Sequence, residues 1–228
     1  MGRKTLLALT IFTVLAGALC ACQNRSDRPA TAGETPQTMR SGDRPSPHPS
    51  PSPDILLINR ENPLPKDYDP GELVNLYERK DRHFQLARAD IEVCQAVFEA
   101  MDAMFAAAQE DGVDAFIITS GYRSPEKQSE VFEGTDDGTA AQPGESEHES
   151  GLAFDVTAKG NSNFERTPQF KWLYKHCGEY GFILRYPKGA QEITGYPYES
   201  WHYRYVGLPH SKIIMDEGIT LEEYLGVR

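Results

Sequence analysis

The longest helical pattern of hydrophobic positions lies between Asp90 and Gln109. Apolar side chains recur there every three or four residues, which predicts an amphipathic helix, and Asp90 is suited to be its N-cap. We expect the apolar stripe of this helix to face the core. The stripe is formed by Ile91, Cys94, Val97, Phe98, Met101, Met104, Phe105 and Ala108.

Start and stop signals predict four shorter helices. Ser or Thr followed by Pro suits the N-cap and the first helical position, and glycine commonly ends a helix. Near the C-terminus, one segment has a glycine stop and another opens with a Thr-x-x-Glu capping box. The four helices are expected from Ser124-Pro125 to Gly134, from Thr167-Pro168 to Gly181, within 208–218, and from Thr220 onward.

Short apolar runs, rich in β-branched and aromatic residues, predict strands. In the last of them, WHYRYVG, bulky and polar residues alternate. His202 and Arg204 would therefore share one face of that strand, and Trp201 and Tyr203 would share the other. The expected strands are 55–58, 115–119, 152–157, FILRYP from Phe182, and WHYRYVG from Trp201.

The N-terminal segment reads as an export signal. Arg3 and Lys4 precede an apolar run that ends at Ala21 and Cys22. We interpret residues 1–22 as a lipoprotein-type signal peptide in which Cys22 becomes lipidated, and a plain secretory signal is the alternative. The protein would then be exported and lipid-anchored at the extracytoplasmic face of a bacterial membrane.

Composition divides the rest of the chain into a tether and a domain. Residues 23–53 are rich in Pro and Ser and have few apolar side chains, so they cannot form a core and are expected to be a disordered tether. Residues 54–228 are long enough for one globular domain, which we expect to be monomeric.

The charge of the domain excludes one class of partner. Residues 1–53 hold six Lys and Arg against three Asp and Glu, a net charge of +3, and the whole chain has −11. Residues 54–228 therefore carry −14, which argues against nucleic acid as a partner. Two cysteines of this domain, Cys94 and Cys177, lie on apolar stripes and are either free buried thiols or a disulfide.

The segment SEHESGLAFD contains the first candidate site residues. It places His148 seven positions before Asp155, and His202 follows later with Glu199 three residues before it. Two imidazoles and one carboxylate are a common ligand set for a catalytic zinc ion. A carboxylate that is not a ligand can act as general base. A buried salt bridge is the alternative role for Asp155.

The residues around His148 argue against two other kinds of zinc site. Leu152 stands where an HExxH protease would need its second histidine, so that motif is absent. A structural zinc module would favour four ligands rich in cysteine, which this chain does not offer around His148. We interpret three acids of the same segment as solvated side chains without a catalytic role: Glu145, Glu147 and Glu149.

Arg123 is a candidate for substrate binding. It follows a predicted strand and precedes a predicted helix, and a guanidinium at such a junction can hold a carboxylate through two hydrogen bonds. Gln128, about one turn into that helix, would face the same space. The alternative is a surface arginine paired with one of the many acids.

These motifs together resemble a known family. SGYRS, SEHESGLAFDVT and ESWHYRYVG, with the opening ILLINRENPLPKDYDP and the closing ITLEEYL, are similar to the VanY-like D-alanyl-D-alanine carboxypeptidases, zinc peptidases of the bacterial cell wall. The resemblance covers nearly all of residues 54–228. It implies an α+β fold in which a small antiparallel sheet is flanked by helices, as in the Hedgehog and D,D-peptidase group.

The resemblance also implies roles for individual residues. His148, Asp155 and His202 would bind zinc, and Glu199 would be the catalytic base. Arg123, Gln128 and Ser146 would contact the C-terminal end of the peptide.

We expect a zinc carboxypeptidase that removes a terminal D-alanine from peptidoglycan stem peptides. A water molecule activated by zinc would be the nucleophile, and Glu199 would take its proton. The bond cleaved would be either the D,D bond of a pentapeptide or the L,D bond of a tetrapeptide. The alternative is a cell-wall-binding lipoprotein that keeps the fold without turnover.

Overall fold

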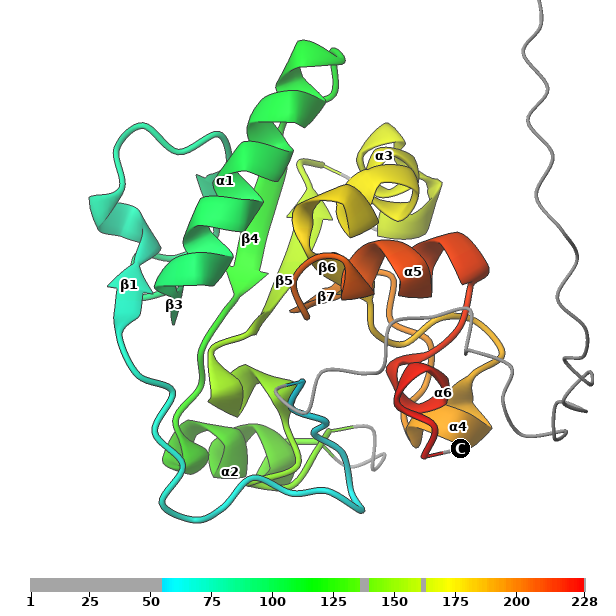
Figure 1. Ribbon diagram of the computed structural model, residues 1–228. Coiled ribbons are helices and arrows are strands. Elements are labelled where there is room, and N and C mark those ends of the chain that lie inside the picture. The colour runs from blue at the N-terminus through cyan, green and yellow to red at the C-terminus, as the bar shows by residue number, and fades with distance from the viewer. Residues whose placement is uncertain (1–54, 136–139, 161–162, 228) are drawn as a thin grey trace, which may run out of the picture. The chain divides into compact units, whose positions relative to one another are not determined.

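The computed structural model describes residues 55–135, 140–160 and 163–227 (Figure 1). The signal segment 1–22, with Cys22, and the tether 23–53 lie outside the described residues and stay predictions. In the described part of the chain, no helix is both long enough and apolar enough to cross a bilayer.

A five-stranded sheet forms the centre of the fold, with strand order β2-β4-β5-β7-β6. Its last four strands are antiparallel neighbours, and β2 pairs with β4 in parallel at one edge. A separate antiparallel pair joins β1 and β3. The strands are β1 Leu73–Asn75, β2 Gln85–Leu86, β3 Glu92–Cys94, β4 Phe116–Ser120, β5 Ala153–Ala158, β6 Phe182–Leu184 and β7 His202–Tyr205.

Helices flank this sheet, so the expected α+β class with a small antiparallel sheet is confirmed, and only the parallel β2–β4 pair at the edge departs from it. The α-helices are α1 Gln95–Glu110, α2 Pro125–Glu133, α3 Pro168–His176, α4 Gln191–Thr194, α5 His210–Glu217 and α6 Leu221–Leu225. Short 3-10 helices are η1 Leu76–Glu78, η2 Glu147–Ser150, η3 Phe164–Arg166 and η4 Cys177–Tyr180.

The helix signals read from the sequence are confirmed at three starts. The Ser124 side chain accepts a hydrogen bond from the backbone N–H of Lys127, and the Thr167 side chain accepts one from Phe170. Thr220 and Glu223 form the reciprocal capping box that opens α6. These caps depend only on neighbouring residues, which is why the sequence predicts them well.

The start of α1 differs from the prediction. The helix begins at Gln95, and Asp90 is not its N-cap, because Glu92–Cys94 forms β3 and pairs with β1. Val93 lies opposite Val74 in this pair and is buried. Pairing with a strand from elsewhere in the chain therefore overrides the helical spacing of the apolar residues.

The predicted strand at 55–58 is wrong. These residues form no strand, and the neighbouring Asn59 makes only an isolated bridge with Asn62. The carbonyl of Leu56 instead accepts a hydrogen bond of 2.6 Å from Nη2 of Arg204. A side-chain donor from β7 thus takes the place of a strand partner.

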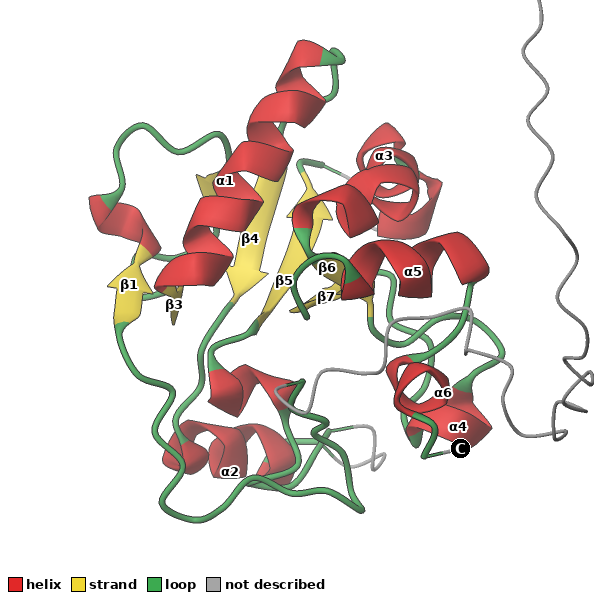
Figure 2. Ribbon diagram, in the orientation of Figure 1, coloured by secondary structure: helices red, strands yellow, loops and turns green. Residues whose placement is uncertain are grey.

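The hydrophobic core lies on one face of the sheet, where α1 covers it (Figure 2). The Phe105 ring of α1 lies 4.7 Å from the Phe116 ring of β4 and 6.1 Å from the Phe154 ring of β5, measured between centroids. Tyr203 of β7 belongs to the same core. Side chains of a strand alternate between the two faces of the sheet. Asp155 therefore projects from the face opposite the core, where a site can form.

Both cysteines of the domain are free thiols, so the disulfide alternative is not realised. Cys177 is buried, and burial raises the pKa of its thiol to about 12. Cys94 is half-buried and donates weak hydrogen bonds to the carbonyls of Pro70 and Ser150, at 3.4 and 3.5 Å.

Gly151 provides a test of the packing around η2. It has a φ of 70°, and a Cβ there would lie 2.7 Å from Cys94 Sγ and 3.0 Å from Leu73 Cδ2. We expect Gly151→Ala to lower the free energy of unfolding by about 1–2 kcal/mol for the left-handed backbone. Overpacking should add about 1–3 kcal/mol. Chemical denaturation measures the sum.

Gly112→Ala is the matched control for this prediction. Gly112 has a similar φ of 77°, but a Cβ there would meet nothing within 4 Å. The control should therefore lose only the backbone contribution. Equal losses in the two variants would contradict the tight packing of Gly151 against Cys94.

Candidate active site

Strand register brings Ser120, Asp155 and His202 into one row across the sheet. Ser120 pairs with Asp155, and Asp155 pairs with His202, in adjacent antiparallel strands. An irregularity between Ile118 and Ser120 places Ser120, rather than Thr119, opposite Asp155. Since directly opposite residues project from the same face, the Asp155 and His202 side chains meet.

His148 reaches this row from η2. Its Nδ1 lies 2.7 Å from the carbonyl oxygen of Gly121, and its own carbonyl accepts a hydrogen bond from the Arg123 N–H at 3.2 Å. The backbone approaches closely here, because a Cβ on Gly121 would lie 2.2 Å from the Glu92 carbonyl oxygen. The segment that directly follows β4 thus holds His148 in place.

The three side chains form a compact cluster of potential metal ligands. His148 Nε2 lies 3.3 Å from Asp155 Oδ2, and His202 Nδ1 lies 3.1 Å from Asp155 Oδ1. One ligand atom from each residue can be chosen so that all lie within 4.8 Å of one another, and all three residues are buried. The predicted ligand set is therefore brought together.

The second nitrogen of each imidazole has its own partner. His148 directs Nδ1 at the Gly121 carbonyl, and His202 Nε2 lies 3.2 Å from Glu147 Oε2. Metal-binding histidines almost always donate their other ring N–H to a carbonyl or carboxylate. The donor set and these partners therefore fit a zinc ion.

Burial and the close contacts within the cluster shift the pKa values of all three side chains. Burial alone would raise the pKa of Asp155, but His148 and His202 hold this pKa well below its usual range. Burial lowers the pKa of His148, although Asp155 opposes the effect. For His202, burial is outweighed by hydrogen bonds to Asp155 and Glu147, which raise the pKa to about 9. A bound metal would compete with a proton on this ring.

Glu199 lies beside the cluster at a greater distance. Its Oε2 is 3.9 Å from His202 Nδ1, and its backbone N–H donates to the Tyr186 carbonyl at 3.1 Å. Burial raises the pKa of Glu199, and the negative charges of Asp155 and Glu147 add to the effect, while His202 opposes it. A raised carboxylate pKa is suited to accepting a proton.

The Arg123 side chain also contacts the cluster. Its Nη1 donates to Gln128 Oε1 at 3.1 Å, and its Nη2 donates to Ser120 Oγ at 3.1 Å. Nη2 also lies 3.4 Å from Asp155 Oδ2. Gln128 is fixed in turn by a hydrogen bond from its Nε2 to the Ala141 carbonyl. The guanidinium is therefore held in one orientation.

All predicted site residues line one cleft of about 180 Å³. Sequence reasoning missed three aromatic residues of its lining, Tyr186, Tyr196 and Trp201. Trp201 was expected beside Tyr203, but β7 begins at His202, so alternation does not extend to Trp201, which is 44% exposed in the cleft. The seven predicted site residues that line the cleft are Arg123, Gln128, Ser146, His148, Asp155, Glu199 and His202.

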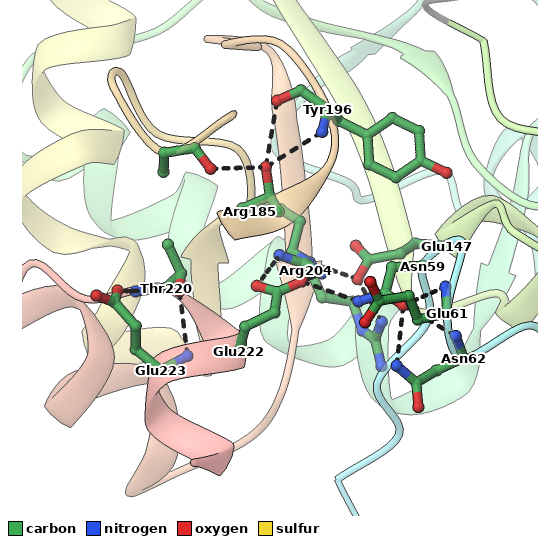
Figure 3. A network of polar contacts seen from close by, with 12 residues as sticks. Asn59, Glu61, Asn62, Glu147, Arg185, Tyr196, Arg204, Thr220, Glu222 and Glu223 are labelled. Atoms are coloured by element: carbon green, nitrogen blue, oxygen red, sulfur yellow. Dashed lines mark hydrogen bonds and ion pairs between the residues drawn. The ribbon is translucent and has the colours of Figure 1, made fainter. Parts of the chain in front are cut away.

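The prediction that Glu147 and Glu149 are solvated is wrong. Both are buried, and Glu147 contacts Arg185 and Arg204, as Figure 3 shows. Glu149 Oε1 accepts a hydrogen bond from the Gly144 N–H at 2.7 Å. The sequence did contain a signal for the burial of Glu147, since Arg185 and Arg204 lie inside two predicted strands. A guanidinium buried in a strand requires a buried carboxylate as its partner.

The family model described as VanY, D-alanyl-D-alanine carboxypeptidase, matches residues 90–208. The chain is 38% identical over 173 residues to a D-alanyl-D-alanine carboxypeptidase of Enterococcus faecium. That match covers 75% of this chain and 57% of the relative, so the chain spans less than two thirds of that protein.

Two solved structures share the fold. The LdcB LD-carboxypeptidase matches with a TM-score of 0.66 at 35% identity, covering 75% of this chain and 84% of that one. A mutant of the D,D-pentapeptidase VanY from a VanB-type resistance cassette, in complex with Zn(II), matches with a TM-score of 0.62 at 35% identity. That match covers 75% of this chain and 98% of the other. The chain therefore belongs to the VanY D-alanyl-D-alanine carboxypeptidase family.

Proposed function

We propose that this protein is a zinc-dependent carboxypeptidase that removes a terminal D-alanine from peptidoglycan stem peptides. The observation that carries the proposal is the buried His148, Asp155 and His202 cluster, with Glu199 and Arg123 in the same cleft. Family membership and the carboxypeptidase names of the similar proteins support it.

His148, Asp155 and His202 would hold the zinc ion. When bound, zinc would lower the pKa of a water molecule from 15.7 to about 7 and polarise a peptide carbonyl. The similar VanY structure in complex with Zn(II) supports this choice of metal. The partners of the two imidazoles, the Gly121 carbonyl and Glu147, would keep the ligating nitrogens turned toward Asp155.

Glu199 would serve as general base and then as general acid. Its carboxylate would accept a proton from the attacking water and deliver it to the leaving amine of D-alanine. The side chain is 20% exposed, so it remains reachable from the cleft. Its position outside the ligand row leaves it free to exchange protons.

Arg123 would bind the terminal carboxylate of the peptide. Its guanidinium is planar and charged, and it can pair with a carboxylate through two parallel hydrogen bonds. Gln128 orients this guanidinium, and Ser146 lines the same cleft. Pairing with the chain terminus would restrict cleavage to the last residue.

Export and lipid anchoring remain part of the proposal on the strength of the sequence alone. A lipidated Cys22 and the tether would hold the domain outside the bacterial membrane, where stem peptides occur. The mass of the mature N-terminal peptide, with Cys22→Ser as the control, would test this localisation.

Mass spectrometry of purified stem peptides tests the proposed function. We expect the zinc-loaded protein to release one alanine from the pentapeptide, the tetrapeptide or both, and a chelator to abolish the release. Loss from the pentapeptide alone indicates D,D specificity, and conversion of tetrapeptide to tripeptide indicates L,D specificity. No change in either peptide would favour a cell-wall-binding protein without turnover.

Glu199→Gln tests the general base. The amide has nearly the same shape but cannot accept the proton, so we expect turnover to fall about 100- to 10,000-fold. Zinc content, measured by atomic emission on the same sample, should stay near that of the wild type. Activity retained at full zinc occupancy would remove the proposed role of Glu199.

Arg123→Lys tests recognition of the carboxylate. Lysine keeps a positive charge but cannot form the bidentate pair, so kcat/KM for a free-acid peptide should fall on the order of 10- to 100-fold. The same peptide with a C-terminal amide is the control substrate, and its slow cleavage should change little. A parallel loss on both substrates would point to a general defect of the site.

A further inference from the structure

The carboxylate of Glu147 connects a proposed metal ligand to two buried arginines. Its Oε2 lies 3.2 Å from His202 Nε2. Its Oε1 accepts hydrogen bonds from Arg185 Nε at 2.6 Å and from Arg204 Nη1 at 2.8 Å (Figure 3). Both oxygens of Glu147 are therefore engaged, and the side chain is fully buried.

A second carboxylate completes the cluster. Glu222 of α6 accepts hydrogen bonds from Arg185 Nη1 at 2.9 Å and from Arg185 Nη2 at 2.7 Å. Two arginines thus face two glutamates, and the charges balance. The two guanidinium groups that contact Oε1 pair with Glu147 as an ionised carboxylate. Buried charges require such pairing.

An ionised carboxylate can only accept hydrogen bonds. The contact between Glu147 Oε2 and His202 Nε2 therefore requires a proton on Nε2, which leaves Nδ1 as the nitrogen that can ligate a metal. Nδ1 is also the nitrogen that faces Asp155. The position of Glu147 thus agrees with the geometry of the proposed ligand set.

We propose that Glu147 is a positioning residue for zinc binding: it sets the tautomer and ring orientation of His202. The inference rests on the proposed zinc site and extends it to a residue that does not touch the metal. Arg185 and Arg204 hold the Glu147 carboxylate in place, and Glu222 holds Arg185. The competing explanation is that Glu147 serves only as a counterion for the arginines.

Glu147→Gln separates these explanations through hydrogen-bond chemistry. An amide has a single accepting oxygen, whereas Glu147 receives donors at both oxygens. The two arginines would hold that oxygen, so the amide NH₂ would face His202 Nε2. This arrangement favours the tautomer with the proton on Nδ1, which opposes metal binding.

Glu222→Gln is the matched control. It also removes a buried negative charge that pairs with Arg185, but among the described residues Glu222 makes no hydrogen bond or ion pair with His202. Both variants should lower the midpoint of chemical denaturation. Only Glu147→Gln should weaken zinc binding, by about 10- to 100-fold, as is typical when the partner of a metal-bound histidine is lost.

Zinc affinity is measured by competition with a chromophoric chelator at one pH, without any peptide substrate. Wild-type affinity in folded Glu147→Gln, or an equal loss in both variants, would overturn the positioning role. Wild-type protein that binds zinc tightly but cleaves no stem peptide would contradict the proposed function alone. The two failures are therefore distinguishable.

A measurement on the wild type covers the case in which Glu147→Gln does not fold. NMR-active cadmium bound to protein with isotopically labelled histidine shows which ring nitrogen is coupled to the metal. We expect coupling to Nδ1 of His202 and to Nε2 of His148. Coupling to Nε2 of His202 would overturn the proposal, because that nitrogen would then be unable to donate to Glu147.

Discussion

Glu147 holds the buried charge on which the site and the surrounding fold both depend. Its carboxylate contacts His202 directly and binds Arg185 and Arg204. Arg185 extends the contacts to Glu222 in α6, and Arg204 extends them to the carbonyl of Leu56. Leaving any of these charges buried and unpaired would cost several kcal/mol. The network is therefore complete only when segments from both ends of the domain are in place.

One face of the sheet packs in the hydrophobic core, and the other face carries the candidate site residues. Phe154 and Tyr203 point into the core beneath α1, while their neighbours Asp155 and His202 point to the opposite face. The same register that packs the aromatic rings thus aligns the proposed ligands. A shift of one residue in β5 or β7 would exchange the two sets, so the packing of the core protects the alignment of the site.

The cleft combines the three kinds of group that the proposed carboxypeptidase reaction would use. A ligand cluster, a carboxylate outside it and an oriented guanidinium lie within one cavity. The similar structures bear names of both L,D- and D,D-specific enzymes. Since the two proposed reactions would use the same groups, we expect the choice between them to depend on how the cleft lining, which includes Tyr186, Tyr196 and Trp201, receives the rest of the peptide.

Local sequence determined the helix caps and the candidate ligands of this protein. Ser124, Thr167 and Thr220 each cap a helix by accepting a hydrogen bond from the residue three positions further on. The residue types and spacing around His148 were enough to predict the candidate ligands. Only the tertiary structure decided that Glu92–Cys94 is a strand and that Glu147 is buried. The partners of Glu147 lie 38 and 57 positions away, at Arg185 and Arg204. A charged side chain is buried only when such distant partners meet it, and no local pattern contains that information.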